Sequence, residues 1–178
     1  MNFLLDPFQR ANLYVSIFTL LQSLAEGSEP PVEVREFLEA LGVEVPELDR
    51  TVARELGRVA ARDVRVDLPE GLRRHLHLHL RSFAERMGYE VPEPADGLIN
   101  MVALAARLAM DAFTAGAGDA ERAEELERAL LRFLMTHLLP VLEDLSVPDE
   151  GLRRLIGGVV DLIKADVEDL KAKFTARS

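Results

Sequence analysis

The segment PDEGLRRLIGGVVDLIKADVEDLKAKF, residues 148–174, decides the fold class that the sequence predicts. Its apolar residues recur at intervals of mostly three and four: Leu152, Leu155, Ile156, Val159, Ile163, Val167, Leu170 and Phe174. Such intervals place side chains on one face of an α-helix, whereas a half-buried strand would alternate apolar and polar residues in steps of two. The segment therefore predicts one long helix, beginning near Pro148, with a single apolar stripe.

The same spacing covers nearly the whole chain, and prolines mark the places where helices begin. We expect six further helices, over residues 7–25, 31–41, 46–63, 69–88, 97–115 and 119–145. Gly27 is the expected C-terminal cap of the first helix, Asp96 is an expected N-terminal cap, and Pro140 should bend or break the helix that contains it. No long linker or internal repeat divides the chain. We therefore expect an all-α fold, in which residues 1–178 form a single-domain bundle of about seven helices.

The composition favours the same conclusion. A chain of 178 residues is long enough for one domain with a sizeable core. It is 48% hydrophobic but only 6% aromatic, and it contains no Trp. The core must therefore consist mainly of Leu, Val and Ala, a composition that suits helices better than strands.

Charge and cysteine content exclude several classes of protein. The net charge is −10, whereas nucleic-acid-binding proteins need a basic surface to replace counterions at the phosphates. The absence of Cys excludes disulfides, thiolate metal sites and a cysteine nucleophile. Asp6 precedes the first basic residue, and polar residues interrupt the apolar stretches before they reach about 18 to 20 residues. We expect a cytoplasmic protein with no nucleic-acid partner and no stable membrane insertion.

The stretch RRHLHLHLRSF, residues 73–83, raises the question of a metal site. His75 and His79 have the i, i+4 spacing by which two imidazoles can hold one zinc ion, but the Glu of the H-E-x-x-H motif is absent. The apolar residues around them follow helical spacing: Leu72, Leu76, Leu80, Phe83 and Met87. We interpret His75, His77 and His79 as residues beside this apolar stripe, and we expect no bound metal.

Catalytic motifs are missing: the chain has no G-x-S-x-G elbow, Walker loop, G-x-G-x-x-G loop or EF-hand loop. We therefore expect neither enzymatic activity nor a cofactor. Two other segments stand out, EPADG at residues 93–97 and FLMTHLLPVL at residues 133–142. In the second, His137 lies on the apolar face, where we expect a buried, hydrogen-bonded histidine. Pro140 should leave the carbonyl of Thr136 without its helical partner.

In this order, the two segments resemble motifs of the TorD/NarJ/DmsD family of redox-enzyme maturation chaperones. The E-P-x-D-H motif is matched at Glu93, Pro94 and Asp96, with Gly97 in place of the histidine. The F-x-x-x-H-L-x-P-W pattern is matched at Phe133, His137, Leu138 and Pro140, with Val141 in place of the tryptophan. The stretch RANLYVSIFTLLQSL is similar to the family's opening helix, with matches at Arg10, Ala11, Leu13 and Tyr14.

The resemblance implies a TorD-like cytoplasmic chaperone that binds an apo-molybdoenzyme catalytic subunit at its N-terminal region, often a twin-arginine signal peptide, and assists cofactor insertion before export or assembly. It implies peptide-binding residues at Glu93, Pro94, Asp96, Gly97 and His137. A groove between helices would bury the apolar part of such a peptide. The carboxylates of Glu93 and Asp96 are candidates to receive its arginines, although an N-cap role would occupy Asp96. The identity of the client and a homodimeric state stay open.

Two other classes of function stay open. A helical adaptor or self-associating scaffold would need a long uninterrupted apolar seam, which the helices at 119–145 and 148–174 come close to offering. A helical metal-dependent hydrolase would need His75, His79 and His137, or nearby carboxylates, to converge.

Overall fold

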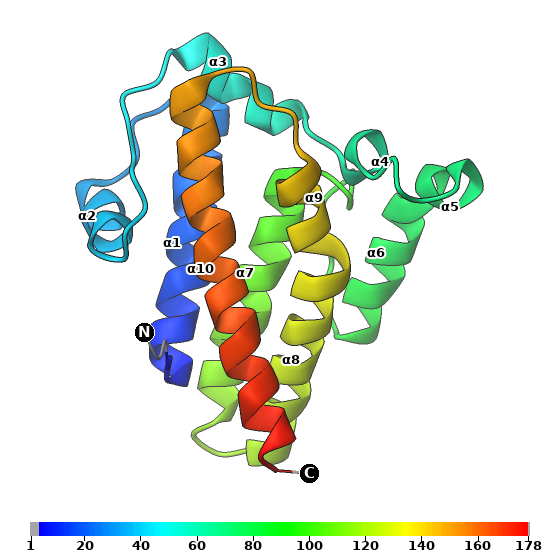
Figure 1. The fold of residues 1–178 in the computed structure, drawn as a ribbon. Coiled ribbons are helices and arrows are strands. Elements are labelled where there is room, and N and C mark those ends of the chain that lie inside the picture. Colours follow the sequence, from blue (N-terminus) through cyan, green and yellow to red (C-terminus); the bar gives the residue numbers. More distant parts are fainter. Residues whose placement is uncertain (1–3, 178) are drawn as a thin grey trace.

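The computed structural model describes residues 4–177 and contains helices but no strand within them (Figure 1). In chain order the elements are α1 (Pro7–Glu26), α2 (Val32–Ala40), α3 (Arg50–Arg54), η1 (Glu55–Arg58), α4 (Ala61–Val64), α5 (Glu70–Arg74), α6 (Leu76–Arg86), α7 (Leu98–Ala115), α8 (Ala120–Phe133), η2 (Leu134–Leu138), α9 (Leu139–Asp144) and α10 (Glu150–Thr175). The expected all-α single-domain fold is confirmed. The helical segments are shorter and more numerous than the seven or so that we expected.

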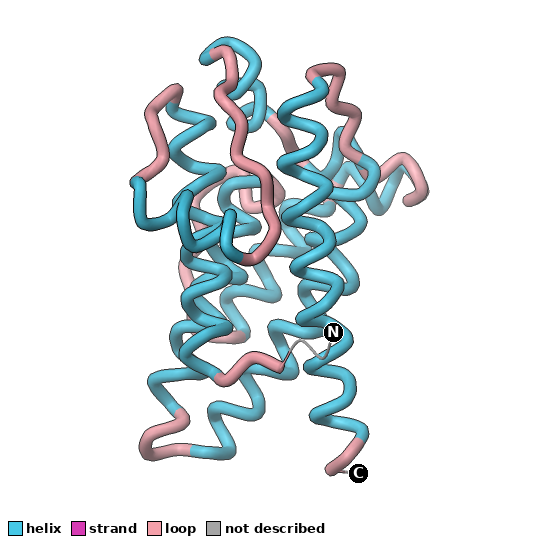
Figure 2. Tube along the Cα trace, turned by 60° about the vertical axis from the view of Figure 1, so that its left-hand side comes forward, coloured by secondary structure: helices cyan, strands magenta, loops and turns pink. Residues whose placement is uncertain are grey.

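The long helices α1, α7, α8 and α10 run along one axis, and the shorter helices gather around the upper half of this bundle (Figures 1 and 2). Helix α7 is central and packs against both α1 and α8. By length and composition alone α7 could cross a membrane, although Asn100, Arg107 and Asp111 interrupt its apolar residues. Half of this helix is buried inside the bundle, which is also typical of a core helix.

The long apolar stripe of α10 is confirmed. All eight of its predicted apolar residues, from Leu152 to Phe174, are buried. Helix α10 begins where the sequence indicates, because the Asp149 carboxylate accepts a hydrogen bond of 2.8 Å from the Leu152 amide and so caps the first turn. The stripe therefore belongs to the core and is not an exposed seam.

Residues 46–63 differ from the single helix that the sequence predicts. Asp49 caps a short α3, and the chain then passes through η1 to an extended stretch before α4. The cause is backbone pairing with a distant segment: the Leu98 amide donates to the Val59 carbonyl at 2.9 Å, and the Ala61 amide donates to the Asp96 carbonyl at 2.7 Å. These bonds require an extended backbone, so the helix cannot continue through residues 59–60.

The predicted helix at 69–88 is also interrupted, at His75, which separates α5 from α6. The predicted stripe holds at Leu76 and Leu80, which are buried, but Leu72 is exposed because α5 does not continue the line of α6.

The predicted disturbance near Pro140 is confirmed. Helix α8 passes into the π-helical turn η2 and then into α9, which has Pro140 in its first turn. Proline has no amide hydrogen, so the carbonyl of Thr136, four residues earlier, lacks its usual helical donor. Arg65 supplies one: its Nη1 lies 2.9 Å from this oxygen.

Candidate functional site

A buried charged network joins α1 to α10. The Arg10 Nε donates to both carboxylate oxygens of Asp166, at 2.8 and 3.1 Å, and its Nη2 donates to Asp169 at 2.7 Å. The Tyr14 hydroxyl also donates to Asp166, at 2.8 Å. Arg10 and Tyr14, which carry part of the family resemblance, therefore connect the first and last helices.

Burial dominates the electrostatics of this network. It raises the pKa of the Asp166 carboxyl, against the opposing effect of Arg10, and raises the pKa of the Tyr14 hydroxyl. Glu127 and Lys173 extend the network as a further ion pair. The Nη1 of Arg10 is buried and makes no hydrogen bond within residues 4–177; its nearest acidic oxygen, on Glu127, is 3.8 Å away. We interpret this cluster as a structural link, since its charged side chains are buried between helices and bind one another.

Asp96 does not cap α7, which corrects the sequence-based expectation. Gly97 occupies the N-cap position without a side-chain hydrogen bond. The Asp96 carboxylate is fully buried and points to Arg62, whose Nε and Nη2 donate to its two oxygens at 2.9 and 2.6 Å; the Arg62 amide adds a third bond of 3.1 Å. Burial alone would raise the pKa of Asp96, but the bonds from Arg62 hold it below its usual value. An arginine from a peptide would have to displace Arg62 to reach this carboxylate.

The other residues of the EPADG segment form a turn. Glu93 is exposed and pairs with Arg81 of α6. The carbonyl of Pro94 accepts hydrogen bonds from the Gly97 amide and the Asn100 side chain, each at 2.9 Å. A Cβ on Gly97 would lie only 3.2 Å from that carbonyl, so this turn is tighter than a histidine at position 97 would allow without movement.

His137 is buried, as expected, but the hydrogen bond that we predicted for its ring is not formed with any residue from 4 to 177. Its Nδ1 has no hydrogen-bond partner within residues 4–177. Its ring centroid lies 5.3 Å from that of His79 and 5.8 Å from that of Phe133. Burial, with smaller contributions from His79 and Arg65, lowers the pKa of His137 to about 4. The ring is therefore neutral at physiological pH.

The three histidines of the hydrolase hypothesis do not form one cluster. His79 lies beside His137, whereas the His75 Nδ1 lies 2.9 Å from the carbonyl of Gly71. Among residues 4–177, no group of three or more His, Cys, Asp or Glu side chains could hold a metal ion.

Helix α4 and the residue after it connect the two motif segments. Arg62 holds Asp96 of the EPADG segment, and Arg65 holds the Thr136 carbonyl of the FLMTHLLPVL segment. Sequence analysis missed both arginines. Their one sequence signal is that they are basic residues in an acidic chain, and this does not identify partners 34 and 71 positions away.

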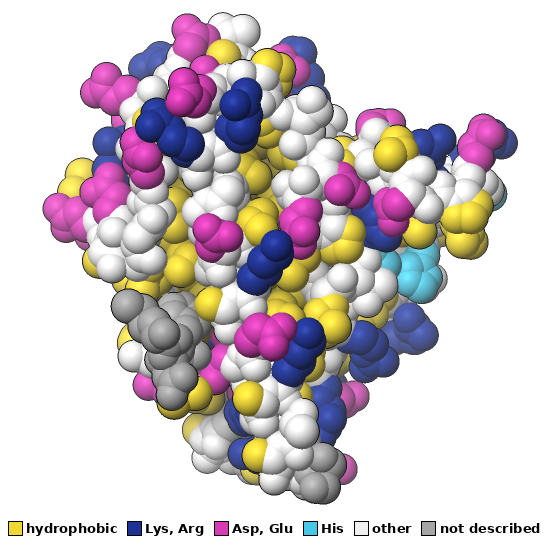
Figure 3. Space-filling model, viewed as in Figure 1, with side chains coloured by type: hydrophobic (Ala, Val, Ile, Leu, Met, Phe, Trp, Pro, Cys, Tyr) yellow, Lys and Arg dark blue, Asp and Glu magenta, His cyan; other side chains and the backbone are white. Residues whose placement is uncertain are grey.

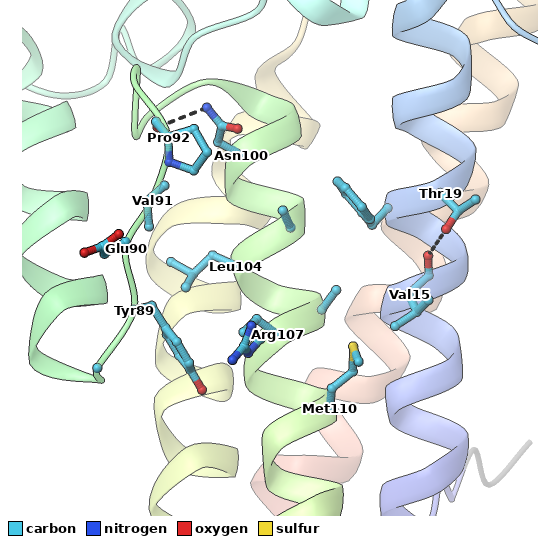
Figure 4. Close-up of a pocket in the computed structure, with 14 residues that line it drawn as sticks. Val15, Thr19, Tyr89, Glu90, Val91, Pro92, Asn100, Leu104, Arg107 and Met110 are labelled. Atoms are coloured by element: carbon cyan, nitrogen blue, oxygen red, sulfur yellow. Dashed lines mark hydrogen bonds between the residues drawn. The ribbon is translucent and has the colours of Figure 1, made fainter.

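A largely apolar cavity of about 600 Å³ opens between α1, α7 and residues 88–92. In Figure 4, α7 runs along its middle, α1 lies on one side and residues 88–92 lie on the other. Its lining includes Val15, Phe18, Val91, Leu104 and Met110. None of the five predicted site residues lines it, but the Asn100 side chain donates to the carbonyls of Pro92 and Pro94, so the EPADG segment adjoins its upper end.

A second hollow, of about 680 Å³, continues the apolar surface along α1 and α7 toward the other end of the bundle. It is lined by Phe8 and Phe113, whose exposed rings meet edge to face with centroids 5.5 Å apart. Phe113 is one helical turn beyond Met110, so the second hollow follows the first along α7. We call them together the α1–α7 groove. It extends from Asn100 on α7 to Ala117, two residues beyond the end of that helix, which is about 25 Å at 1.5 Å per residue.

The face that carries α10 differs from the groove. Acidic and basic side chains are interspersed over it, and acidic side chains gather over α2 (Figure 3). Its charged residues pair with one another, as Lys164 does with Glu143 and Arg154 with Glu44. That face therefore looks like an ordinary solvated surface, and the α1–α7 groove is the stronger candidate for a binding site.

No model of a known protein family matches this chain, and no curated protein matches it. The resemblance to the chaperone family therefore rests on the motif residues alone.

Proposed function

We propose that this chain is a chaperone of the TorD/NarJ/DmsD kind that acts in the cytoplasm without catalysing a reaction. It binds the N-terminal region of an apo-molybdoenzyme catalytic subunit, often a twin-arginine signal peptide, and assists cofactor insertion before export or assembly. The α1–α7 groove carries this proposal, because it is an exposed apolar surface of the length that a short peptide needs. The motif matches at Glu93, Asp96 and His137 supply the choice of family.

The groove suits the apolar part of such a peptide. A length of about 25 Å accommodates roughly 16 residues of helix. Each leucine that becomes fully buried contributes about 1.5–3 kcal/mol, so a few well-placed leucines can offset the loss of translational and rotational freedom on binding. Peptide helices that bind in this way present apolar residues at intervals of three and four.

The charges assign a smaller role to the peptide's arginines. The net charge of −10 attracts a basic peptide over a distance. Glu93 is exposed and can exchange its partner Arg81 for a peptide arginine, whereas Asp96 is buried and already paired. We therefore assign the arginine contact to Glu93 rather than to Asp96.

The scaffold alternative is less well supported. It requires an exposed apolar seam on the C-terminal helices, but the stripe of α10 is buried inside the bundle. Self-association through the α1–α7 groove would compete with peptide binding, and sedimentation of the free protein would detect it.

Titration of a labelled twin-arginine leader from the same organism tests the proposal. We expect binding at tens of micromolar or tighter. Met110→Ser in the groove should weaken binding roughly fivefold, because binding would cover the exposed half of this side chain. Met135→Ser is the matched control, since Met135 is equally exposed (44% against 46%) but does not line the groove.

Two results would contradict the proposal. One is the absence of binding by every molybdoenzyme leader of the organism at these concentrations. The other is an equal loss of affinity in Met110→Ser and Met135→Ser, which would place the peptide elsewhere.

A further inference from the structure

Arg107 is a basic residue held in a fixed orientation within the α1–α7 groove. Its Nε donates to Asp111 Oδ2 at 3.0 Å, one helical turn further along α7. The Tyr89 hydroxyl donates to the same oxygen at 2.7 Å, and the guanidinium carbon lies 5.4 Å from the Tyr89 ring centroid. In Figure 4 Arg107 lies beside the Tyr89 ring, between α7 and residues 88–92. Contacts from two segments therefore restrict this side chain.

The outer edge of the guanidinium is not used by the protein. Nη1 and Nη2 of Arg107 make no hydrogen bond with any residue from 4 to 177, and the side chain is 62% exposed. A guanidinium has five N–H donors, and the contact with Asp111 uses the one on Nε. The four remaining donors are on Nη1 and Nη2, and one N–H of each nitrogen points along the outer edge, which matches the two oxygens of a carboxylate.

The surroundings make this edge selective. Of the described residues that line the 600 Å³ part of the groove, Arg107 is the one basic residue and Glu90 the one acidic residue. Glu90 points away from α7 in Figure 4. The nearby lining residues Leu104 and Met110 are apolar, so an occupant that covers them also displaces water from around the guanidinium. An ion pair formed there is stronger than one on an open surface.

From this geometry we infer that Arg107 is the polar anchor of the groove and binds a carboxylate within the apolar stretch of the bound peptide. The inference rests on the proposed function, to which it adds a specificity: an apolar helical peptide with one Asp or Glu on its groove-facing side. Charge complementarity supports the inference. Arg107 is the one basic residue among the described residues of this lining; Asp111 accepts the hydrogen bond from its Nε, and the donors on Nη1 and Nη2 are left for a ligand.

A scan of synthetic peptides tests the inference. Each peptide has two arginines followed by an apolar stretch of about 16 residues, the helical length of the groove. One Glu is placed at successive positions of the apolar stretch, and each peptide is compared with the one that has Gln at the same position. At one position or at two positions a turn apart, Glu should bind about tenfold more tightly than Gln, as expected for a charge-assisted pair that is partly exposed.

Variants of the protein assign this preference to Arg107. Arg107→Gln should remove the preference, so that Glu and Gln peptides bind this variant equally, and Arg107→Lys should restore only part of it, because an ammonium cannot form the paired contact. Arg132→Gln is the charge-matched control, since Arg132 is exposed, lies on α8 and does not line the groove. Thermal unfolding of each variant verifies that it is folded.

The outcomes separate the two proposals. If Glu and Gln peptides bind equally at every position, or if Arg132→Gln removes the preference equally, the anchor is refuted while peptide binding stands. If no apolar peptide binds, the proposed function and the inference are refuted together.

Discussion

Two arginine–aspartate pairs connect distant parts of this chain, and they differ in their access to water. Arg10 and Asp166 join α1 to α10, and both side chains are buried, with exposed fractions of 3% and 0%. Arg62 and Asp96 join α4 to the segment before α7, and there Asp96 is equally buried while Arg62 is 35% exposed.

The pKa shifts of the two aspartates are opposite. The pKa of Asp166 is raised, because burial outweighs Arg10 and because the carboxylate of Asp169 lies close by. The pKa of Asp96 is lowered, since the Arg62 guanidinium binds both oxygens of its carboxylate and the backbone amide of Arg62 adds a third bond. Burial thus outweighs the bonds to the carboxylate at Asp166 but not at Asp96, and water reaches the arginine of the second pair but not that of the first.

The largest effect is expected when the buried pair is broken. Asp166→Ala should lower the free energy of unfolding by about 3–5 kcal/mol, because Arg10 stays buried with Asp169 as its main remaining partner. Urea denaturation measures this change. Asp161→Ala, an exposed position on the same helix, is the control and should change the free energy by less than about 0.5 kcal/mol. Equal losses in the two variants would contradict the assigned role of the buried network.

The second largest effect on stability is expected from His137, which follows Thr136, the residue whose carbonyl Arg65 binds. Its pKa is about 4 in the folded protein and about 6.5 in the unfolded chain, so between these pH values the unfolded chain binds more protons at this residue. The free energy of unfolding should therefore fall as pH falls from 6.5 to 4, by about 3 kcal/mol from this group.

His137→Leu isolates this contribution from those of His79 and the carboxylates. The variant should show a shallower decline between pH 6.5 and 4 in urea denaturation. Near pH 7 its stability should equal or exceed that of the wild type, because the leucine removes a buried nitrogen that has no partner within residues 4–177. A pH dependence identical to that of the wild type would show that His137 is not the group responsible.

The smallest effect is expected at the Arg62–Asp96 pair, in which the arginine is partly exposed. Arg62→Met keeps most of the side-chain stem but removes the guanidinium, and it should lower the free energy of unfolding by about 2 kcal/mol. The loss is smaller than at Asp166 because water can reach the site that Arg62 covers. Arg132→Met is the control. A loss as large as that of Asp166→Ala would show that solvent access does not distinguish the two pairs.

The parts of the fold that sequence predicts well are those with long, regular apolar spacing. The stripe of α10, the start of α8 at Asp119 and the released carbonyl of Thr136 all follow from local rules about spacing, caps and proline. Residues 46–63 are different, since the helix predicted there ends where the chain pairs with the distant residues 96–98. Local rules carry no information about such a partner.

The candidate site is divided in the same way. Sequence identifies the EPADG and FLMTHLLPVL segments, because each is a contiguous pattern. The α1–α7 groove is assembled from three segments, within residues 6–19, 88–92 and 100–117. Apolar spacing shows which face of each helix is apolar, but it does not show where neighbouring elements stop covering that face and leave it exposed. The anchoring role of Arg107 likewise depends on Tyr89, which lies in a different segment.

The link between Arg10 and Asp166 also affects the timing of synthesis. The two residues are 156 positions apart. At roughly 5–20 residues per second, a ribosome adds Asp166 about 8 to 30 s after Arg10. During that interval Arg10 and Tyr14 have no carboxylate from α10 to bind, so the first helix is complete long before its final partner exists. The bundle can therefore close fully only after the last helix has been made. A stalled or truncated product that ends before residue 166 would lack the carboxylate that pairs with Arg10 on α1.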